Sequence, residues 1–179
     1  LFEDMSHDDG CKLNMADFLQ PKIEAEIAFF LKSDLSGGSV TEGDVLDATD
    51  YVVASFEIVD SRIRDWKLKL PDTIADNASA GCYVLGKRLF AAGSVDLASV
   101  KMQLLRNGHP AGEGFGGDVM GSPYRTVAWL SNKLWEYGVE LRKGELILSG
   151  ALSAASAVSK GDMFEARFSD LGRITVEFV

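Results

Sequence analysis

The stretch Gln20-Pro21-Lys22-Ile23-Glu24-Ala25-Glu26-Ile27-Ala28-Phe29-Phe30-Leu31 places two carboxylates inside an apolar run that is typical of a β-strand. Successive side chains of a strand point to opposite faces of the sheet. Glu24 and Glu26 are therefore predicted to share one face. The other face carries Ile23 and Ile27 and is apolar, so this strand is expected to lie over the core.

Two carboxylates on one half-buried face repel each other, and burying a carboxylate is costly unless something compensates its charge. A divalent cation bound between Glu24 and Glu26 is the simplest compensation. The alternative is an ordinary amphipathic strand whose carboxylates face water. A second strand-like segment, 51–59, carries Glu57 near its end. Glu57 is a third candidate ligand, although alone it would be read as a strand-end carboxylate in solvent.

Composition predicts one soluble globular domain, residues 1–179, because 46% of the residues are hydrophobic and 25% are charged. The net charge of -9 and the pI near 4.7 argue against nucleic acid or an anionic membrane as the main partner, since both select for clustered Lys and Arg. An acidic protein can still bind an anionic small molecule through a metal. No apolar run approaches the roughly 18 residues that span a membrane.

The cysteines and histidines indicate no metal or disulfide site. Cys11 and Cys82 lie in unrelated contexts, so we interpret them as free thiols of a cytoplasmic protein. His7 and His109 fall in turn-like segments and are expected at the surface. The chain begins at Leu1 in what reads as structured sequence, so we expect it to be part of a longer protein.

The other segments predict an α+β, predominantly β domain with a curled mixed sheet and a few flanking helices. Turn and capping signals place a helix from Thr41 to Asp50 and another from Ser122 to Tyr137. Segment 60–79 is interpreted as a polar connection, and Asn107-Gly108 as a hairpin turn. Strands are expected at 51–59, 82–86, 96–106, 145–152, 163–168 and 173–178.

Two further segments are expected to serve packing. The apolar stripe of the helix at 122–137 contains Val127, Leu130 and Leu134, with Trp129 and Trp135 filling the space beside it. Residues 112–117 are glycine-dense but lack the G-x-G-x-x-G spacing and the following Lys-Ser or Lys-Thr of a phosphate loop. We interpret them as a flexible or closely packed loop.

Several collinear segments carry a family resemblance: 1–5 (LFEDM), 20–28 (QPKIEAEIA), 56–66 (FEIVDSRIRDW), 72–79 (DTIADNAS), 127–134 (VAWLSNKL) and 147–152 (ILSGAL). Together they make the chain resemble the bacterial 2-hydroxypenta-2,4-dienoate (2-oxopent-4-enoate) hydratases of the fumarylacetoacetate hydrolase superfamily. The resemblance runs from Leu1 to Val179. It implies a fumarylacetoacetate-hydrolase-like catalytic domain with a curled sheet or roll.

The resemblance also implies that Glu24, Glu26 and Glu57 hold one Mg²⁺ or Mn²⁺, the same three carboxylates that the strand pattern indicates. Ligation by oxygen alone suits a hard cation and leaves positions for substrate and water. The implied reaction adds water to 2-hydroxypenta-2,4-dienoate, a product of the meta-cleavage of aromatic compounds, and yields 4-hydroxy-2-oxopentanoate. The metal would act as a Lewis acid towards the substrate.

Substrate-binding residues follow from the same resemblance. Asp76, Asn77 and Ser79 would border the site, while Ser149 and Gly150 would offer hydroxyl and backbone donors to the substrate. Ser79 could equally be a helix cap, and Gly150 a simple turn. The family's acid/base lysine and aspartate come from a segment that would lie upstream of Leu1, so we expect this chain to lack them.

Two other functions stay open. The 4-oxalocrotonate decarboxylases resemble the hydratases in fold and in the three carboxylates, although Arg62 to Thr73 and Ser149 to Leu152 look more hydratase-like here. The other alternative is a non-catalytic partner subunit, because hydratase and decarboxylase of such pathways tend to associate. A homo-oligomer is expected from the resemblance.

Overall fold

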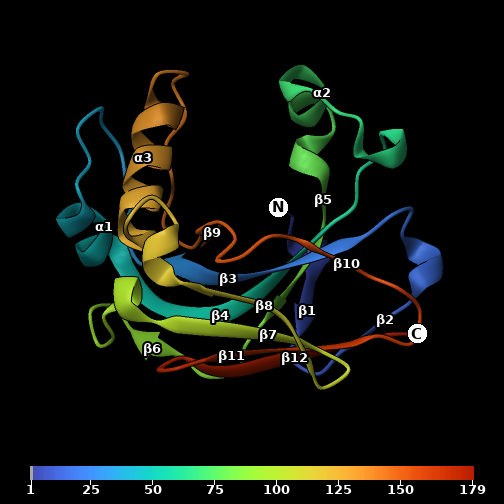
Figure 1. Ribbon diagram of the computed structural model, residues 1–179. Coiled ribbons are helices and arrows are strands. Elements are labelled where there is room, and N and C mark those ends of the chain that lie inside the picture. Colours follow the sequence, from blue (N-terminus) through green and yellow to red (C-terminus); the bar gives the residue numbers. More distant parts are fainter. Residues whose placement is uncertain (1) are drawn as a thin grey trace.

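The computed structural model describes residues 2–179, which form two β-sheets with helices on one side (Figure 1). The helices are α1 (Glu42–Ala48), α2 (Leu70–Ala75) and α3 (Pro123–Trp135). The strands are β1 (Ser6–Asp8), β2 (Lys12–Leu13), β3 (Lys22–Leu31), β4 (Thr49–Val59), β5 (Ala80–Leu85), β6 (Phe90–Ala91), β7 (Lys101–Arg106), β8 (His109–Phe115), β9 (Leu146–Leu148), β10 (Ser156–Ala157), β11 (Met163–Phe168) and β12 (Gly172–Phe178). None of the described helices is long and apolar enough to cross a membrane.

The long antiparallel pair β3–β4 forms the centre of the first sheet, whose strand order is β1-β5-β4-β3-β10. β6 extends this sheet beside β4, and β9 beside β3. The pairing is antiparallel except between β1 and β5, so the sheet is mixed as expected. The alternation in β3 is also as expected, because Ile23 and Ile27 are fully buried.

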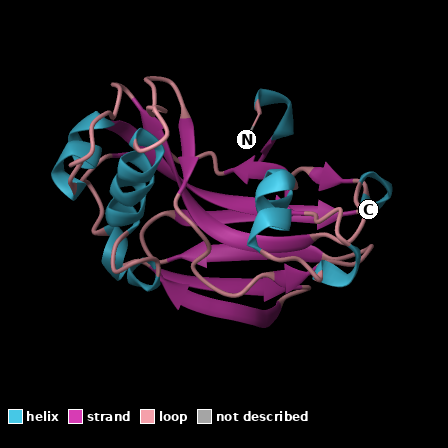
Figure 2. Cartoon of the chain, turned by 90° about the horizontal axis from the view of Figure 1, so that it is seen from above, coloured by secondary structure: helices cyan, strands magenta, loops and turns pink. Residues whose placement is uncertain are grey.

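The second sheet, in the order β2-β12-β11-β7-β8, packs against the apolar face of the first and lies below it in Figure 1. Figure 2, seen from above, shows the helices lying over the strands. Leu104, Phe164 and Ile174 from this sheet join Ile23 and Ile27 in one buried cluster. Burying large aliphatic and aromatic side chains between two sheets is the main stabilising contribution to such a fold. The face of β3 and β4 that points away from this core is left for the site.

Two of the helices form one group at an end of the sheets. Thr41 caps α1 through a capping box with Asp44, as the sequence predicts. The loop before α1 is tied to α3, because the Asn132 side chain accepts a hydrogen bond from Val40 N and donates one to Val40 O. The prediction for the tryptophans was wrong: Trp129 and Trp135 are 51% and 45% exposed, and Val127 alone of the predicted stripe is fully buried.

The glycine-dense segment is not a flexible loop. Residues 112–115 belong to β8, and the strand returns from a tight turn at Asn107 and Gly108, which both have positive φ as predicted. A Cβ built on Gly114 would lie 1.8 Å from the Leu152 carbonyl oxygen. Glycine is therefore required at position 114 because another backbone segment passes directly over it.

Segment 60–79, predicted to be a polar connection, contains α2 and two 3-10 turns at Arg64–Trp66 and Asn77–Ser79. The sequence interpretation missed α2 because this helix is only 6 residues long, too short to show a periodic apolar stripe; its apolar residues Leu70 and Ile74 are exposed. Five non-glycine residues here have positive φ: Asp65, Trp66, Asn77, Ala78 and Ser79. Such backbone is uncommon outside glycine, so specific contacts must hold it.

Candidate metal centre

The three predicted carboxylates lie together. One oxygen from each of Glu24, Glu26 and Glu57 falls within 4.8 Å of the others, and this is the one such cluster of possible metal ligands in residues 2–179. The register explains the meeting, since Glu24 of β3 is directly opposite Glu57 of β4 and Glu26 is two residues further along the same face.

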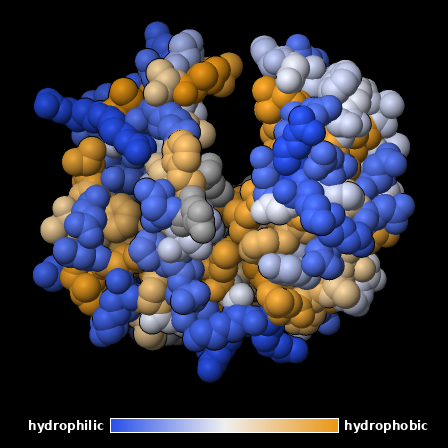
Figure 3. Space-filling model, turned by 180° about the vertical axis from the view of Figure 1, so that it is seen from behind, coloured by the Kyte–Doolittle hydropathy of each residue, from blue (hydrophilic) through white to orange (hydrophobic). Residues whose placement is uncertain are grey.

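The carboxylate cluster faces away from the second sheet, because the intervening residues of β3 form the core. Figure 1 shows α2 on one side of this open face and α1 with α3 on the other. In the space-filling view from behind, a deep groove separates two lobes, and hydrophobic residues line both of its lips (Figure 3). Leu70 and Ile74 are exposed apolar residues of α2. The cluster is thus placed on the sheet face that this groove overlies.

Burial and mutual repulsion act together on these carboxylates. Burial, then the negative charge of Glu57, raise the pKa of Glu26 well above its ordinary value. Burial, followed by the charge of Glu24, raises the pKa of Glu57 to about 7. Burial raises the pKa of Glu24 as well, although the nearby charge of Lys22 opposes that effect. Three carboxylates that resist being ionised together are the donor set that a hard dication satisfies.

Glu26, the most buried of the three carboxylates, is also held in place by a hydrogen bond from the backbone. It is 2% exposed, and its Oε2 accepts a 2.8 Å hydrogen bond from Gly150 N. Gly150 adopts φ +101°, so this turn, which follows β9, presents its N–H to the site. The predicted residue Gly150 therefore reaches the cluster, through its backbone.

Two hydroxyls that have no hydrogen-bond partner in the described part of the chain lie close to Glu26 in the fold. Ser149, a predicted site residue, is fully buried, its N bonds to Ile27 O, and its Oγ is unpaired. Ser55, which the sequence interpretation missed, sits opposite Glu26 in the β3–β4 register and its buried Oγ is also unpaired. A buried hydroxyl without a partner is uncommon in native structures. The only signal for Ser55 in the sequence was its position two residues before Glu57, which places both side chains on the same strand face.

The other predicted residues hold their own loop together. Asp76 Oδ2 accepts hydrogen bonds from Ser61 Oγ, Arg62 N and Ser79 Oγ. Ser79 is buried, while Asn77 is exposed with positive φ. These three residues therefore lie together at the second 3-10 turn, and the side-chain contacts of Asp76 and Ser79 lie within segment 60–79.

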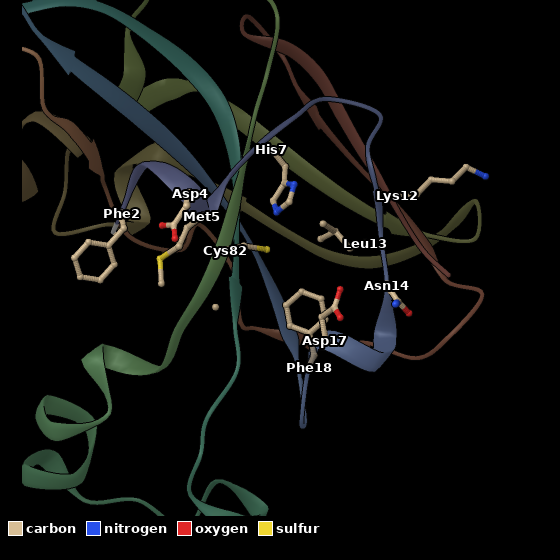
Figure 4. A pocket seen from close by; sticks show the side chains of 11 residues that line it. Phe2, Asp4, Met5, His7, Lys12, Leu13, Asn14, Asp17, Phe18 and Cys82 are labelled. Carbon is tan, nitrogen blue, oxygen red and sulfur yellow. The ribbon is translucent and has the colours of Figure 1, made fainter.

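A separate cavity of about 530 Å³ lies elsewhere, lined by residues that include His7, Asp17, Phe18 and Cys82 (Figure 4). Cys82 is opposite Ile58 in the β4–β5 register, so its side chain points to the face away from Glu57. Burial is the main cause that raises the pKa of the Cys82 thiol to about 12. A thiol that stays protonated is a poor nucleophile and ligand, so Cys82 offers no reactive thiolate to this cavity.

Sequence comparison decides the family. The family described as "Fumarylacetoacetate (FAA) hydrolase C-terminal" matches residues 8–179. The chain belongs to the fumarylacetoacetate hydrolase family. This match agrees with the resemblance seen in the sequence and with the curled two-sheet fold.

Two relatives of known name are similar in sequence to this chain over nearly its whole length. A 2-hydroxyhexa-2,4-dienoate hydratase of Comamonas testosteroni is 46% identical over 180 residues, which is 99% of this chain and 68% of that protein. A 2-keto-4-pentenoate hydratase of Paraburkholderia xenovorans is 46% identical over 178 residues, 66% of its length. The chain thus spans about two thirds of these relatives.

A solved structure is also closely similar. The 4-oxalocrotonate decarboxylase from Pseudomonas putida G7, complexed with magnesium and adipate, superposes with a TM-score of 0.96 at 34% identity. The match covers 99% of this chain and 67% of that one. This decarboxylase therefore shares the fold of this chain.

Proposed function

We propose that this chain is the catalytic domain of a metal-dependent hydratase that converts 2-hydroxypenta-2,4-dienoate (2-oxopent-4-enoate) into 4-hydroxy-2-oxopentanoate. The observation that carries the proposal is the cluster of Glu24, Glu26 and Glu57 on one sheet face. The 46% identity to proteins named as hydratases of a hexadienoate and of a ketopentenoate supports this substrate class.

For the metal we propose Mg²⁺ or Mn²⁺, held by Glu24, Glu26 and Glu57. The all-oxygen donor set supports a hard dication, and so does the magnesium in the similar decarboxylase structure. When bound, the ion would supply Lewis-acid stabilisation of negative charge on a substrate oxygen. Gly150 N–H would keep Glu26 oriented towards it.

The remaining site residues would bind the substrate. Ser149 Oγ, buried and unpaired, is available to donate to the substrate's carboxylate or carbonyl oxygen. The border of the site is still predicted to include Asp76, Asn77 and Ser79. Because Gly150 N–H already bonds to Glu26, we propose that it orients this carboxylate and does not bind substrate.

Proton transfer needs groups other than the three glutamates. A carboxylate that coordinates a cation is held in its ionised form and cannot take up a proton freely. The lysine and aspartate that the family resemblance implies for this task are not assigned to any residue described here. They stay a prediction, as do the homo-oligomer and an association with a decarboxylase.

The test is an assay of the full-length protein, which would supply the acid/base residues, with two substrates, after removal of divalent metal and after its return. We expect 2-hydroxypenta-2,4-dienoate to be hydrated with Mg²⁺ or Mn²⁺ present and the activity to disappear with EDTA. Formation of 4-hydroxy-2-oxopentanoate is followed by loss of dienol absorbance and by chromatography. Activity that is unaffected by EDTA would contradict the role of the metal.

Decarboxylation is the second candidate function, because the structure of a 4-oxalocrotonate decarboxylase superposes on this chain with a TM-score of 0.96. The same assay with 2-oxo-3-hexenedioate separates the two. Release of CO₂ from this substrate, without hydration of the pentadienoate, would replace the hydratase proposal by this one.

A further inference from the structure

Lys22 is the cation beside the carboxylate cluster. It lies on β3 two residues before Glu24, so both side chains share a face of the sheet and their Cα atoms are about 7 Å apart. The positive charge of Lys22 acts on the Glu24 carboxyl. Within residues 2–179 Lys22 forms no ion pair, so its charge is not neutralised by a carboxylate contact.

An aromatic ring fixes the ammonium group of Lys22. Its Nζ lies 4.2 Å from the centroid of the Trp66 ring, within the range of a cation–π interaction. The Trp66 indole is held in turn, because Nε1 donates a 3.1 Å hydrogen bond to Gln20 O. Gln20 Nε2 donates to Ser61 O and Ile63 O, which ties the loop that carries Trp66 to the start of β3.

The backbone at the ring is unusual. Asp65 and Trp66 have φ of 59° and 55°, in the left-handed region that non-glycine residues rarely adopt. Such a conformation persists where surrounding contacts hold it, and it is concentrated at functional sites. The loop thus places a tryptophan over a lysine at the edge of the carboxylate cluster.

The charges at the proposed metal site leave negative charge that Lys22 can balance. Three ionised carboxylates and one dication leave one negative charge, and the carboxylate of a 2-oxo acid adds another. We propose that Lys22, held by Trp66, contacts the carboxylate of the bound 2-oxo acid and determines the preference of the site for anionic substrates. This inference rests on the proposed function and adds a substrate-binding residue to it.

The test is binding of oxalate, a stable 2-oxo-acid mimic, to the Mg²⁺-loaded protein by isothermal titration calorimetry. Losing a charge-assisted contact weakens binding by about tenfold or more. We expect Lys22→Met and Lys22→Gln to raise the Kd for oxalate by this factor and to raise KM more than they lower kcat. Lys22→Arg, which keeps the charge, should stay within about threefold of wild type.

Lys32→Met is the matched control. Lys32 directly follows β3 and lies ten positions after Lys22, about 33 Å away at the rise of a strand. We expect this variant to bind oxalate as wild type does. Circular dichroism and Mg²⁺ titration of each variant show whether the fold and the metal site are intact, and Lys22→Gln provides the answer where Lys22→Met does not fold.

Two results would overturn the inference. One is unchanged oxalate binding in the folded Lys22→Gln variant. The other is a loss of Mg²⁺ affinity that accounts for all of the loss in oxalate affinity, because Lys22 would then act only on Glu24. The titration does not depend on turnover. Oxalate binding that needs Lys22, in a protein that does not hydrate the dienoate, would keep this inference and remove the proposed hydratase activity.

Discussion

At the scale of single residues, the site is a set of carboxylates that the fold holds closer together than their charges favour. Glu26 is nearly inaccessible to water, and its neighbours Glu24 and Glu57 carry the same charge. A free buried carboxylate would avoid this by taking up a proton. The cluster is therefore understandable as a cation site, and its behaviour without the cation gives two tests.

The first test is Glu26→Gln. The amide oxygen can still accept the hydrogen bond from Gly150 N, while the charge is lost. We expect the affinity for Mg²⁺ or Mn²⁺ to fall by about 100-fold, since a ligand contributes at least as much as the groups that orient it. In EDTA the variant should be more stable than wild type, because the cost of burying the Glu26 carboxylate and its repulsion from Glu57 are both removed.

The control for this variant is Glu113→Gln, which removes an exposed carboxylate of β8. Calorimetric metal titration and thermal unfolding in EDTA measure both effects. If Glu26→Gln binds the metal as tightly as Glu113→Gln does, Glu26 is not a ligand.

The second test uses pH on the metal-free protein. The pKa of Glu57 is raised from 4.5 to about 7, so between these values the folded state binds more protons than the unfolded state. The free energy of unfolding should therefore fall as the pH rises from 4.5 to 7, by about 3 kcal/mol at most from this group. Urea unfolding in EDTA at pH 5 and pH 8 measures it. In Glu57→Gln the decrease should be smaller, and an equal decrease would contradict the assignment.

At the scale of elements, β3, β4, β5, β11 and β12 could be predicted from sequence within a few residues. The prediction was wrong for β8, which was taken for a loop, and too long at 96–106 and 145–152, where the strands are Lys101–Arg106 and Leu146–Leu148. The alternation in 20–31 predicts both faces of β3, and the pairing of Glu24 with Glu57 needs only that β3 and β4 be neighbours. The same kind of local pattern does not predict α2, whose apolar residues point outward. It is silent too on Trp129, because whether a helix face is covered depends on what packs against it.

Part of the site was also beyond prediction from local pattern. Ser55 is brought opposite Glu26 by strand register, and Gly150 N reaches Glu26 across 124 positions of sequence. Such contacts depend on long-range packing, which residue spacing does not encode. Family resemblance supplied Gly150 as a candidate, but it did not supply the hydrogen bond.

Gly114→Ala tests how the strands support the site. The added Cβ would collide with Leu152 O, and Leu152 N donates to Ala25 O on β3, between the two glutamates. We expect the free energy of unfolding to fall by about 1–3 kcal/mol and the metal affinity to fall as well, because the segment 150–152 must move.

The matched control is Gly43→Ala on α1. Its nearest contact for a Cβ is the Thr41 side chain at 3.6 Å, so there is space for the methyl group. We expect a gain in stability of up to about 1 kcal/mol, because alanine favours the helix more than glycine does. Urea unfolding and Mg²⁺ titration of both variants check the prediction. Wild-type metal affinity in Gly114→Ala would show that the contact with Leu152 does not support the site.

At the scale of the whole molecule, metal binding should couple to folding. The three proposed ligands come from two central strands of the first sheet, so they come together only in the folded state. Any ligand that binds the folded state alone stabilises it, by about 2.7 kcal/mol at 100 times the Kd. For a chain of this size this corresponds to a Tm increase of about 5–10 °C.

Differential scanning calorimetry with Mg²⁺ or Mn²⁺ against EDTA measures this increase. Glu26→Gln should show much less of it. An identical Tm in metal and in EDTA would mean that the ions do not bind the folded protein specifically.

The most direct test of the metal centre is a crystal structure of the protein with Mn²⁺ and oxalate, with anomalous diffraction recorded at the manganese edge. We predict one strong anomalous peak between the carboxylates of Glu24, Glu26 and Glu57, with oxalate bound to the same ion. An anomalous map with no peak at these three carboxylates, in crystals that hold manganese elsewhere, would contradict the account.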